Sequence, residues 1–192
     1  MHDTPAGTVE VRRQDGIAIL TLTRPAAGNR ITRQMAEAGV AALKEVRSDR
    51  SITGCVLTGD GDVFCTGGDY QGAGSSSAGR LEFARAHNDL AQATSRLGKP
   101  LVAAINGDAH AGGFSLIALC DLAVCANEVM PRPRVLERAI ELAASTRHAN
   151  PDIISIGRDL YYDTRGATPH DANERARFAL VAALKALDES PA

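Results

Sequence analysis

Two glycine-rich segments hold the residue types in this sequence that are best suited to chemistry. The first covers residues 64–69 (FCTGGD) and the second covers residues 106–113 (NGDAHAGG). Gly112 directly precedes a predicted helix, and the unpaired N–H groups and the dipole of a helix N-terminus favour negative charge. With a second backbone N–H group, from Gly68, it could form a two-donor site for the oxygen of a polarised carbonyl.

The glycines of both segments also have a purely structural explanation, because glycine permits tight turns and close packing of backbones. The residues alone leave both explanations open. Neither segment matches the phosphate-binding P-loop or the dinucleotide-binding GxGxxG motif. The four cysteines, Cys55, Cys65, Cys120 and Cys125, lack metal-site spacing and lie in or beside apolar runs, so we expect buried free thiols.

Both segments follow apolar runs that predict strands. Such runs, rich in β-branched residues, cover residues 8–13, 17–23, 53–58, 100–105 and 121–125. Asp15 and Gly16 predict a hairpin between the first two strands. The last two runs have almost no polar side chains, so we expect both strands to be buried.

Helical spacing of apolar residues predicts helices between these strands. They cover residues 32–47, with Thr32 as the N-cap, residues 81–97, ended by Gly98, and residues 112–119. Residues 72–79 (GAGSSSAG), which precede the second helix, have the composition of a flexible linker.

Beyond Glu128 the pattern predicts helices alone, over residues 135–145, 151–161 and 171–187. Strands and helices alternate before that point, which is typical of a layered α/β domain. We therefore expect an N-terminal core at residues 1–128 and a C-terminal helical segment at residues 129–192.

Composition excludes several classes of function. The chain has 192 residues, 44% of them hydrophobic, and a net charge of -2, which gives no basic field for nucleic acid or a membrane surface. Apolar runs are shorter than the ~20 residues that span a bilayer, and the first residues lack the apolar core of a signal peptide. We expect a cytoplasmic protein with no metal and with no nucleic-acid or membrane partner.

Four stretches in a fixed order resemble the crotonase superfamily, the enoyl-CoA hydratase/isomerase family. They are residues 22–25 (LTRP) with Asn29, residues 56–59 (VLTG) and 63–69 (VFCTGGD), residues 99–107 (KPLVAAING) with 111–113 (AGG), and residues 120–124 (CDLAV). The resemblance covers residues 8–128 well and residues 129–187 more weakly. It implies a spiral of ββα units, followed by C-terminal helices of the type that builds a homotrimer or a dimer of trimers.

The resemblance also implies an acyl-CoA thioester as ligand and no separate cofactor, since CoA is carried by the substrate. By motif position, the backbone N–H groups of Gly68 and Gly112 form the oxyanion hole for a thioester enolate. A loop formed by Ala26, Ala27 and Gly28 lies along the adenosine part of CoA. The remaining residues expected around the thioester and the pantetheine arm are Asp69, Tyr70, Gln71 and Ser115.

The sequence departs from the family at the two glutamates with which hydratases activate water. Ser115 stands at the position of the first glutamate, and the stretch that would hold the second is missing. We infer an internal deletion near Glu128 that removes one wall of the active site. Isomerisation or decarboxylation of an enoyl- or acyl-CoA then fits better than hydration, and the alternative is an inactive relic or oligomer partner. A hydrolase that uses Ser115 would need a His–carboxylate relay that the sequence does not indicate.

Several other ionisable residues have a functional and a structural interpretation. His110 could act as an acid or base or be an ordinary loop residue, and Glu128 could replace the lost glutamate. Tyr70 could line the thioester pocket or only pack. Asp121 is expected to satisfy backbone groups at the start of a strand. For Arg158 and Arg165 we expect a solvated surface, with contact to a CoA phosphate of a neighbouring subunit as the alternative.

Overall fold

A computed structural model describes residues 6–74, 76–126, 131–145 and 151–164, together with residues 168, 171 and 175. Its strands are β1 (Thr8–Gln14), β2 (Ile17–Thr23), β3 (Gly54–Gly59), β4 (Val63–Cys65), β5 (Leu101–Ile105), β6 (Asp108–Ala109) and β7 (Leu122–Cys125). Its helices are the short 3₁₀ turn η1 (Pro25–Ala27) and α1 (Arg33–Ser48), α2 (Ser77–Ser95), α3 (Gly112–Ala118), α4 (Arg132–Ser145) and α5 (Pro151–Thr164). Residues 171–187, expected to form a helix, lie almost entirely outside the described residues.

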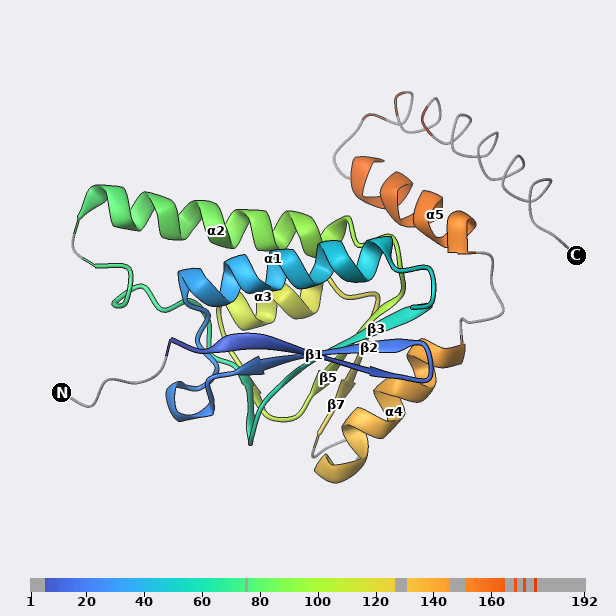
Figure 1. Ribbon diagram of the computed structural model, residues 1–192, viewed down its shortest axis with the longest axis horizontal. Helices are drawn as coiled ribbons and strands as arrows, with labels where there is room; N and C mark the ends of the chain where they lie inside the picture. The colour runs from blue at the N-terminus through green and yellow to red at the C-terminus, as the bar shows by residue number, and fades with distance from the viewer. Residues whose placement is uncertain are drawn as a thin grey trace, which may run out of the picture.

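Three successive ββα units build the first part of the fold, as the resemblance implied (Figure 1). The main sheet has the order β1-β2-β3-β5-β7, and β4 and β6 form a separate two-stranded sheet. The first pair is antiparallel, joined at Asp15 and Gly16, which have φ values of +49° and +78°. The other neighbours in both sheets are parallel. The carboxyl ends of the parallel strands β3 and β5 therefore lie on the same side of the main sheet.

Helices cover both faces of the main sheet, with α1, α2 and α3 on one side and α4 on the other (Figure 1). The alternation of β2 explains this arrangement, because neighbouring side chains of a strand point to opposite faces. Leu20 and Leu22 pack with Met35 of α1, whereas Ile17 and Ile19 belong to the cluster that contains α4. All four strand residues are at most 2% exposed.

Strand β7 differs from the expectation of a buried strand. It lies at the edge of the main sheet, and Leu122, Ala123 and Cys125 are exposed, while Val124 is buried. An apolar sequence predicts a strand, but it does not show whether another part of the chain covers that strand. The expectation of buried thiols is therefore wrong for Cys125, and Cys120 is only half-buried. Cys55 and Cys65 are buried as expected, and burial raises the pKa of the Cys55 thiol to about 12.

Helix α2 also differs from the sequence prediction, because it begins at Ser77 and ends at Ser95. The side chain of Ser76 caps it by accepting a hydrogen bond from the N–H of Gly79 at 3.0 Å. The expected linker is therefore helical from residue 77, since a serine cap outweighs the flexible composition of the segment. Among the described residues, no helix is long and apolar enough to cross a membrane.

Candidate functional site

The two glycine-rich segments meet beside the main sheet. Strands β4 and β6 pair in parallel and hold the segments in register, and the N–H of His110 donates to the Cys65 carbonyl at 3.0 Å. A β-carbon added to Gly112 would lie 3.6 Å from the backbone nitrogen of Gly68. The fold thus brings together the two glycines that the sequence singled out.

The backbone N–H groups of these two glycines are unpaired among the described residues. Gly68 forms an isolated β-bridge with Ile31, but the hydrogen bonds of this bridge are made by its two neighbours. The Ile31 N–H donates to the Gly67 carbonyl at 2.8 Å, and the Asp69 N–H donates to the Ile31 carbonyl at 2.9 Å. Within the described ranges, neither the Gly68 N–H nor the Gly112 N–H has a hydrogen-bond acceptor. Two unpaired donors on adjacent backbones can bind one oxygen that carries negative charge.

A strained residue precedes Gly112. Ala111 is the N-cap of α3 and has φ +45° and ψ −115°, a conformation that L-residues rarely adopt. Such a residue costs on the order of 1–3 kcal/mol and persists only where its surroundings impose it. Here the following Gly113 N–H is bound to the His110 carbonyl at 2.8 Å. The turn at Ala111 therefore fixes the direction in which the chain enters α3.

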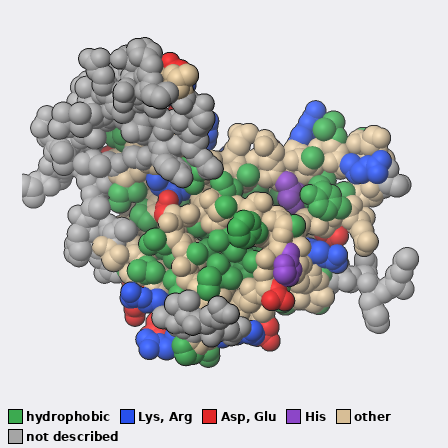
Figure 2. All heavy atoms as spheres, turned by 180° about the vertical axis from the view of Figure 1, so that it is seen from behind, with side chains coloured by type: hydrophobic (Ala, Val, Ile, Leu, Met, Phe, Trp, Pro, Cys, Tyr) green, Lys and Arg blue, Asp and Glu red, His purple; other side chains and the backbone are tan. Residues whose placement is uncertain are grey.

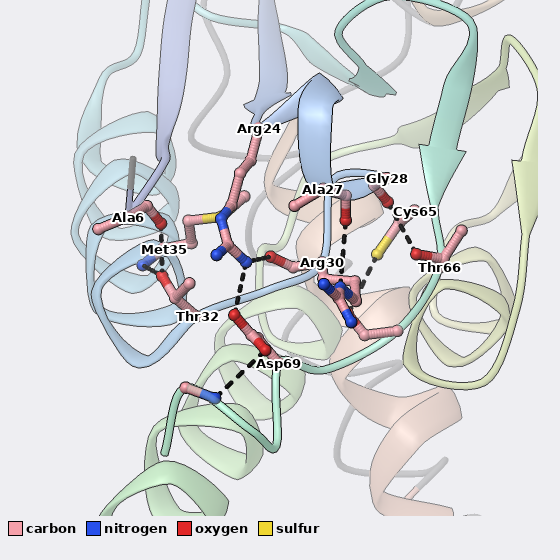
Figure 3. A network of polar contacts seen from close by, with 12 residues as sticks. Ala6, Arg24, Ala27, Gly28, Arg30, Thr32, Met35, Cys65, Thr66 and Asp69 are labelled. Atoms are coloured by element: carbon pink, nitrogen blue, oxygen red, sulfur yellow. Dashed lines mark hydrogen bonds and ion pairs between the residues drawn. The ribbon is translucent and has the colours of Figure 1, made fainter. Parts of the chain in front are cut away.

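A buried ion pair holds the residue that follows Gly68 (Figure 3). Nη1 of Arg24 lies 2.7 Å from Oδ2 of Asp69 and also contacts the Arg30 carbonyl at 3.4 Å. Burial alone would raise the pKa of Asp69. The Arg24 hydrogen bond, the Gly72 N–H and the charges of Arg24 and Arg30 together outweigh it and hold this pKa below its ordinary value. Asp69 is thus a paired carboxylate that positions the loop.

The predicted adenosine loop lies against the first glycine-rich segment. Ala26 and Ala27 belong to η1, and Gly28 follows with φ +61°. The Gly28 carbonyl accepts hydrogen bonds from Thr66, from its N–H at 2.9 Å and from its hydroxyl at 3.1 Å (Figure 3). Residues 26–28 therefore border the first glycine-rich segment at Thr66.

Two asparagines, one buried and one half-buried, support the loop between β3 and β4. Asn29 is fully buried, and its Nδ2 donates to the carbonyls of Asp60 at 2.9 Å and Val63 at 2.7 Å. Nδ2 of Asn106 donates to the Gly59 carbonyl at 2.9 Å. These amides satisfy the backbone of the loop after β3, where no ladder partner is available.

A stack of three rings lies behind Gly68, and sequence reasoning considered only its outer member, Tyr70. Tyr70 contacts Phe83 with ring centroids 4.9 Å apart, and Phe83 contacts His87 at 4.0 Å. A β-carbon on Gly68 would lie 2.9 Å from Cζ of Phe83 and 3.2 Å from Nε2 of His87. The spacing of Phe83 and His87, four residues apart in a helix, was the available signal that they share a face.

His87 is the functional candidate that the sequence interpretation missed. Its Nδ1 lies 3.1 Å from the Phe83 carbonyl, and its buried Nε2 makes no hydrogen bond of ordinary geometry among the described residues. Burial lowers the pKa of His87, although the carbonyls of Phe83 and Ile31 act in the opposite direction. Burial therefore favours the neutral form of the imidazole.

The other predicted site residues lie in less constrained positions. The side chains of His110 and Gln71 are exposed, and the exposed Ser115 hydroxyl lies 3.3 Å from the Ala111 carbonyl of its own helix. Within the described part of the chain, no group of three acidic, His or Cys side chains could hold a metal ion. Glu128 and Arg165 lie outside the described residues.

The prediction that Arg158 lies on a solvated surface is wrong. It is 7% exposed and forms an ion pair with Asp121, whose Oδ2 also accepts the Leu101 N–H at 2.7 Å. Asp121 therefore satisfies the backbone near a strand start, as expected. Arg158 is buried because it reaches this carboxylate and the Thr94 carbonyl from α5. It is thus committed to a contact within the chain.

Two elements of the fold, α3 and β7, expose large apolar side chains. Phe114, in the first turn of α3, is 65% exposed and Leu122 of β7 is 51% exposed. Hydrophobic side chains gather near the centre of the face opposite to that of Figure 1 (Figure 2). Large apolar side chains of α3 and β7 are therefore left in solvent within the described part of the chain.

Comparison with known proteins gives consistent matches. The sequence profile described as Enoyl-CoA hydratase/isomerase matches residues 12–132. The 4-chlorobenzoyl coenzyme A dehalogenase-2 of an Arthrobacter species is 32% identical over 155 residues, which cover 78% of this chain and 56% of that protein. The probable peroxisomal enoyl-CoA hydratase 1 of Arabidopsis thaliana is 36% identical over 117 residues, 60% of this chain and 43% of that one.

The fold has the same relatives. The crystal structure of an enoyl-CoA hydratase from Polaromonas sp. JS666 superposes with a TM-score of 0.82 at 20% identity and covers 91% of each chain. At this identity the likeness concerns the fold. The chain spans about half the length of the curated relatives that it matches.

Proposed function

Because this chain belongs to the enoyl-CoA hydratase/isomerase family, we propose that it binds an acyl-CoA thioester whose carbonyl oxygen accepts hydrogen bonds from Gly68 and Gly112. The observation that carries this proposal is the pair of unpaired N–H groups on adjacent backbones. Residues 26–28 would lie along the adenosine part of CoA, as expected from the family resemblance. CoA arrives with the substrate, so no further cofactor is proposed.

The chemistry that follows is stabilisation of a thioester enolate. Removal of a proton or of carbon dioxide next to the carbonyl leaves an electron pair that is delocalised onto the thioester oxygen. Two fixed N–H donors stabilise that charge, and loss of one such donor typically costs on the order of 10²–10³ in rate. We propose isomerisation or decarboxylation of an enoyl- or acyl-CoA as the reaction class.

Hydration by a pair of glutamates is not proposed. Ser115 occupies the position of the first glutamate, and its hydroxyl contacts its own helix at the Ala111 carbonyl. Asp69 is engaged by Arg24 and so is not available as a base. These two observations also favour a second candidate function, an inactive family member that serves as an oligomer partner.

Thermal unfolding with and without ligand tests the proposed site. Saturation with butyryl-CoA at 100 times Kd adds about 2.7 kcal/mol of stability, which raises the Tm of a chain of this size by roughly 5–10 °C. The matched control ligand is S-butyl-CoA, a thioether that lacks the carbonyl oxygen and should give a clearly smaller shift. Equal shifts for the two ligands would exclude the role of the two N–H groups.

A substrate panel separates the two candidate functions. Enoyl-, β-keto- and malonyl-type CoA thioesters are offered to protein that shows the thermal shift. Turnover above background supports enolate chemistry, whereas binding without turnover supports the inactive partner. We also propose a homotrimer or a dimer of trimers in the cytoplasm. Sedimentation velocity and localisation of a tagged chain test these two points.

A further inference from the structure

Tyr70 presents an open aromatic ring beside the proposed thioester site. It follows Gly68 by two residues and is 72% exposed. The chain has only four Phe, three Tyr and no Trp, so an aromatic side chain left in solvent is unusual in this protein. Folding alone does not explain an aromatic side chain that remains in solvent at this point. Exposed aromatic surface beside a binding site is a common means of recognising an apolar ligand.

The ring of Tyr70 is fixed from behind. Its partner Phe83 is 3% exposed and meets it at an interplanar angle of 51°, and His87 supports Phe83 at 34°. Phe83 and His87 lie on one face of α2, so the helix anchors the stack. A ring held on one side and open on the other is a preorganised platform.

The platform lies beside the proposed oxyanion donor. Cε2 of Tyr70 would lie 3.4 Å from a β-carbon on Gly68, which places the ring edge next to that glycine. A carbonyl oxygen bound at the Gly68 N–H therefore brings the attached acyl group close to the stack. This step rests on the proposed function of the two glycines.

We infer that Tyr70 selects acyl-CoA thioesters whose acyl group is a planar aromatic ring. A flexible aliphatic chain gains most from an enclosed apolar tunnel, and an open ring offers it little enclosure. A rigid planar ring can lie on an exposed aromatic face, and ring–ring contacts add stabilisation beyond the buried area. Tyr70 is 72% exposed, so its free side leaves room for a rigid group.

Two ligands of similar size test the inference. Benzoyl-CoA and cyclohexanecarbonyl-CoA both carry a six-membered ring, but only the first is aromatic and planar. Isothermal titration should show benzoyl-CoA binding about three- to tenfold more tightly to the unmodified protein, the range expected from one aromatic contact. Tyr70→Phe should keep this ratio, and Tyr70→Ala should reduce it to less than about twofold.

A matched variant and two outcomes make the test decisive. Leu81→Ala removes another exposed apolar side chain, 51% exposed on α2, and should leave the ratio unchanged. Equal affinities for the two ligands, or an unchanged ratio in Tyr70→Ala, would overturn the inference while the proposed function stands. Failure of the unmodified protein to bind either thioester would overturn both. Circular dichroism confirms that each variant is folded.

Discussion

Arg24 and Asp69 are 45 residues apart in the chain and form a buried ion pair beside Gly68. Their side chains are 9% and 8% exposed, and 2.7 Å separates Nη1 from Oδ2. Arg24 directly follows β2, and Asp69 follows one of the two proposed oxyanion donors. The pair therefore links the stability of the fold to the geometry of the site.

Replacement of Asp69 by Asn should destabilise the protein in a pH-dependent manner. Loss of one partner leaves Arg24 buried beside a neutral group, and breaking a buried pair costs about 3–5 kcal/mol. The pKa of Asp69 is lowered in the folded state, so its contribution is complete well above the unfolded carboxyl pKa of about 3.9. That contribution disappears as pH falls through the lowered pKa, and the variant and the unmodified protein converge there.

Urea unfolding from pH 7 down to pH 3 measures this convergence. Asp108→Asn is the control, because Asp108 is an exposed carboxylate on β6 near the same site. It should change the free energy of unfolding by less than about 0.5 kcal/mol. A loss in Asp69→Asn that stays constant across the pH range would contradict the assigned ion pair.

Gly112 and Gly113 are adjacent, but the structure predicts that an added methyl group reduces the stability of the fold only at Gly113. A β-carbon on Gly113 would lie 2.0 Å from the Cys65 carbonyl oxygen, whereas on Gly112 the nearest atom is Cα of Gly67 at 3.5 Å. Gly113→Ala should therefore destabilise the fold by about 1–3 kcal/mol or more. Gly112→Ala should fold normally, because its methyl group has ordinary contacts.

The cost of Gly112→Ala should appear in ligand binding. The added carbon lies 3.6 Å from the Gly68 nitrogen and so crowds the space between the two N–H donors. We expect the thermal shift with butyryl-CoA to be lost while the Tm of the free protein is kept. Differential scanning fluorimetry of both variants with and without ligand is the measurement. A full shift in Gly112→Ala would place the thioester elsewhere.

Local sequence patterns predicted those features that depend on neighbouring residues. The Asp15–Gly16 turn and the Thr32 cap of α1, whose side chain accepts from the Met35 N–H at 3.1 Å, follow from residues close in sequence. For Gly68 and Gly112 the residues alone left a two-donor site and a purely structural role open, and the resemblance favoured the two-donor site. The ββα arrangement came from the resemblance.

Features that depend on distant partners were not predictable. Arg158 is marked as surface by its type, and its partner Asp121 lies 37 residues earlier in the chain. The burial of β7 depends on what lies beyond the edge of the sheet, which its own apolar residues do not encode. His87 faces Gly68 because α2 crosses this loop, and no local pattern specifies that crossing.

Removal of the His87 imidazole should make the free energy of unfolding less dependent on pH below about pH 7. Burial lowers the pKa of His87 in the folded state, while the unfolded chain takes up the proton near pH 6.5. Below that pH the unfolded state binds more protons, so stability falls as pH decreases toward the lowered pKa. His87→Gln should reduce this fall between pH 7 and pH 5.

Urea unfolding at half-unit pH steps gives the two slopes. His110→Gln serves as the control, because the His110 side chain is exposed and lies near the same glycines. Its slope should match that of the unmodified protein. If His110→Gln flattened the profile and His87→Gln did not, the assignment of the buried imidazole would be wrong.

Arg158 should determine whether α5 stays docked. It brings a buried charge from α5 to Asp121, its Nη2 donates to the Thr94 carbonyl at 3.3 Å, and its guanidinium lies 5.7 Å from the Tyr162 ring centroid. Arg158→Met removes the hydrogen bonds and the charge. Loss of about 1–3 kcal/mol of local stability should speed amide exchange in α5 by roughly five- to 150-fold, with α1 unchanged.

A second ion pair on the same helix provides the contrast. Asp159 lies 4.0 Å from Arg47, and these side chains are 42% and 48% exposed, so solvent screens the pair. Asp159→Ala should leave amide exchange in α5 within about twofold of the unmodified protein. Hydrogen exchange followed by mass spectrometry resolves both helices. Equal effects of the two substitutions would mean that α5 is held by the sum of its surface contacts, and the buried arginine would lose its assigned role.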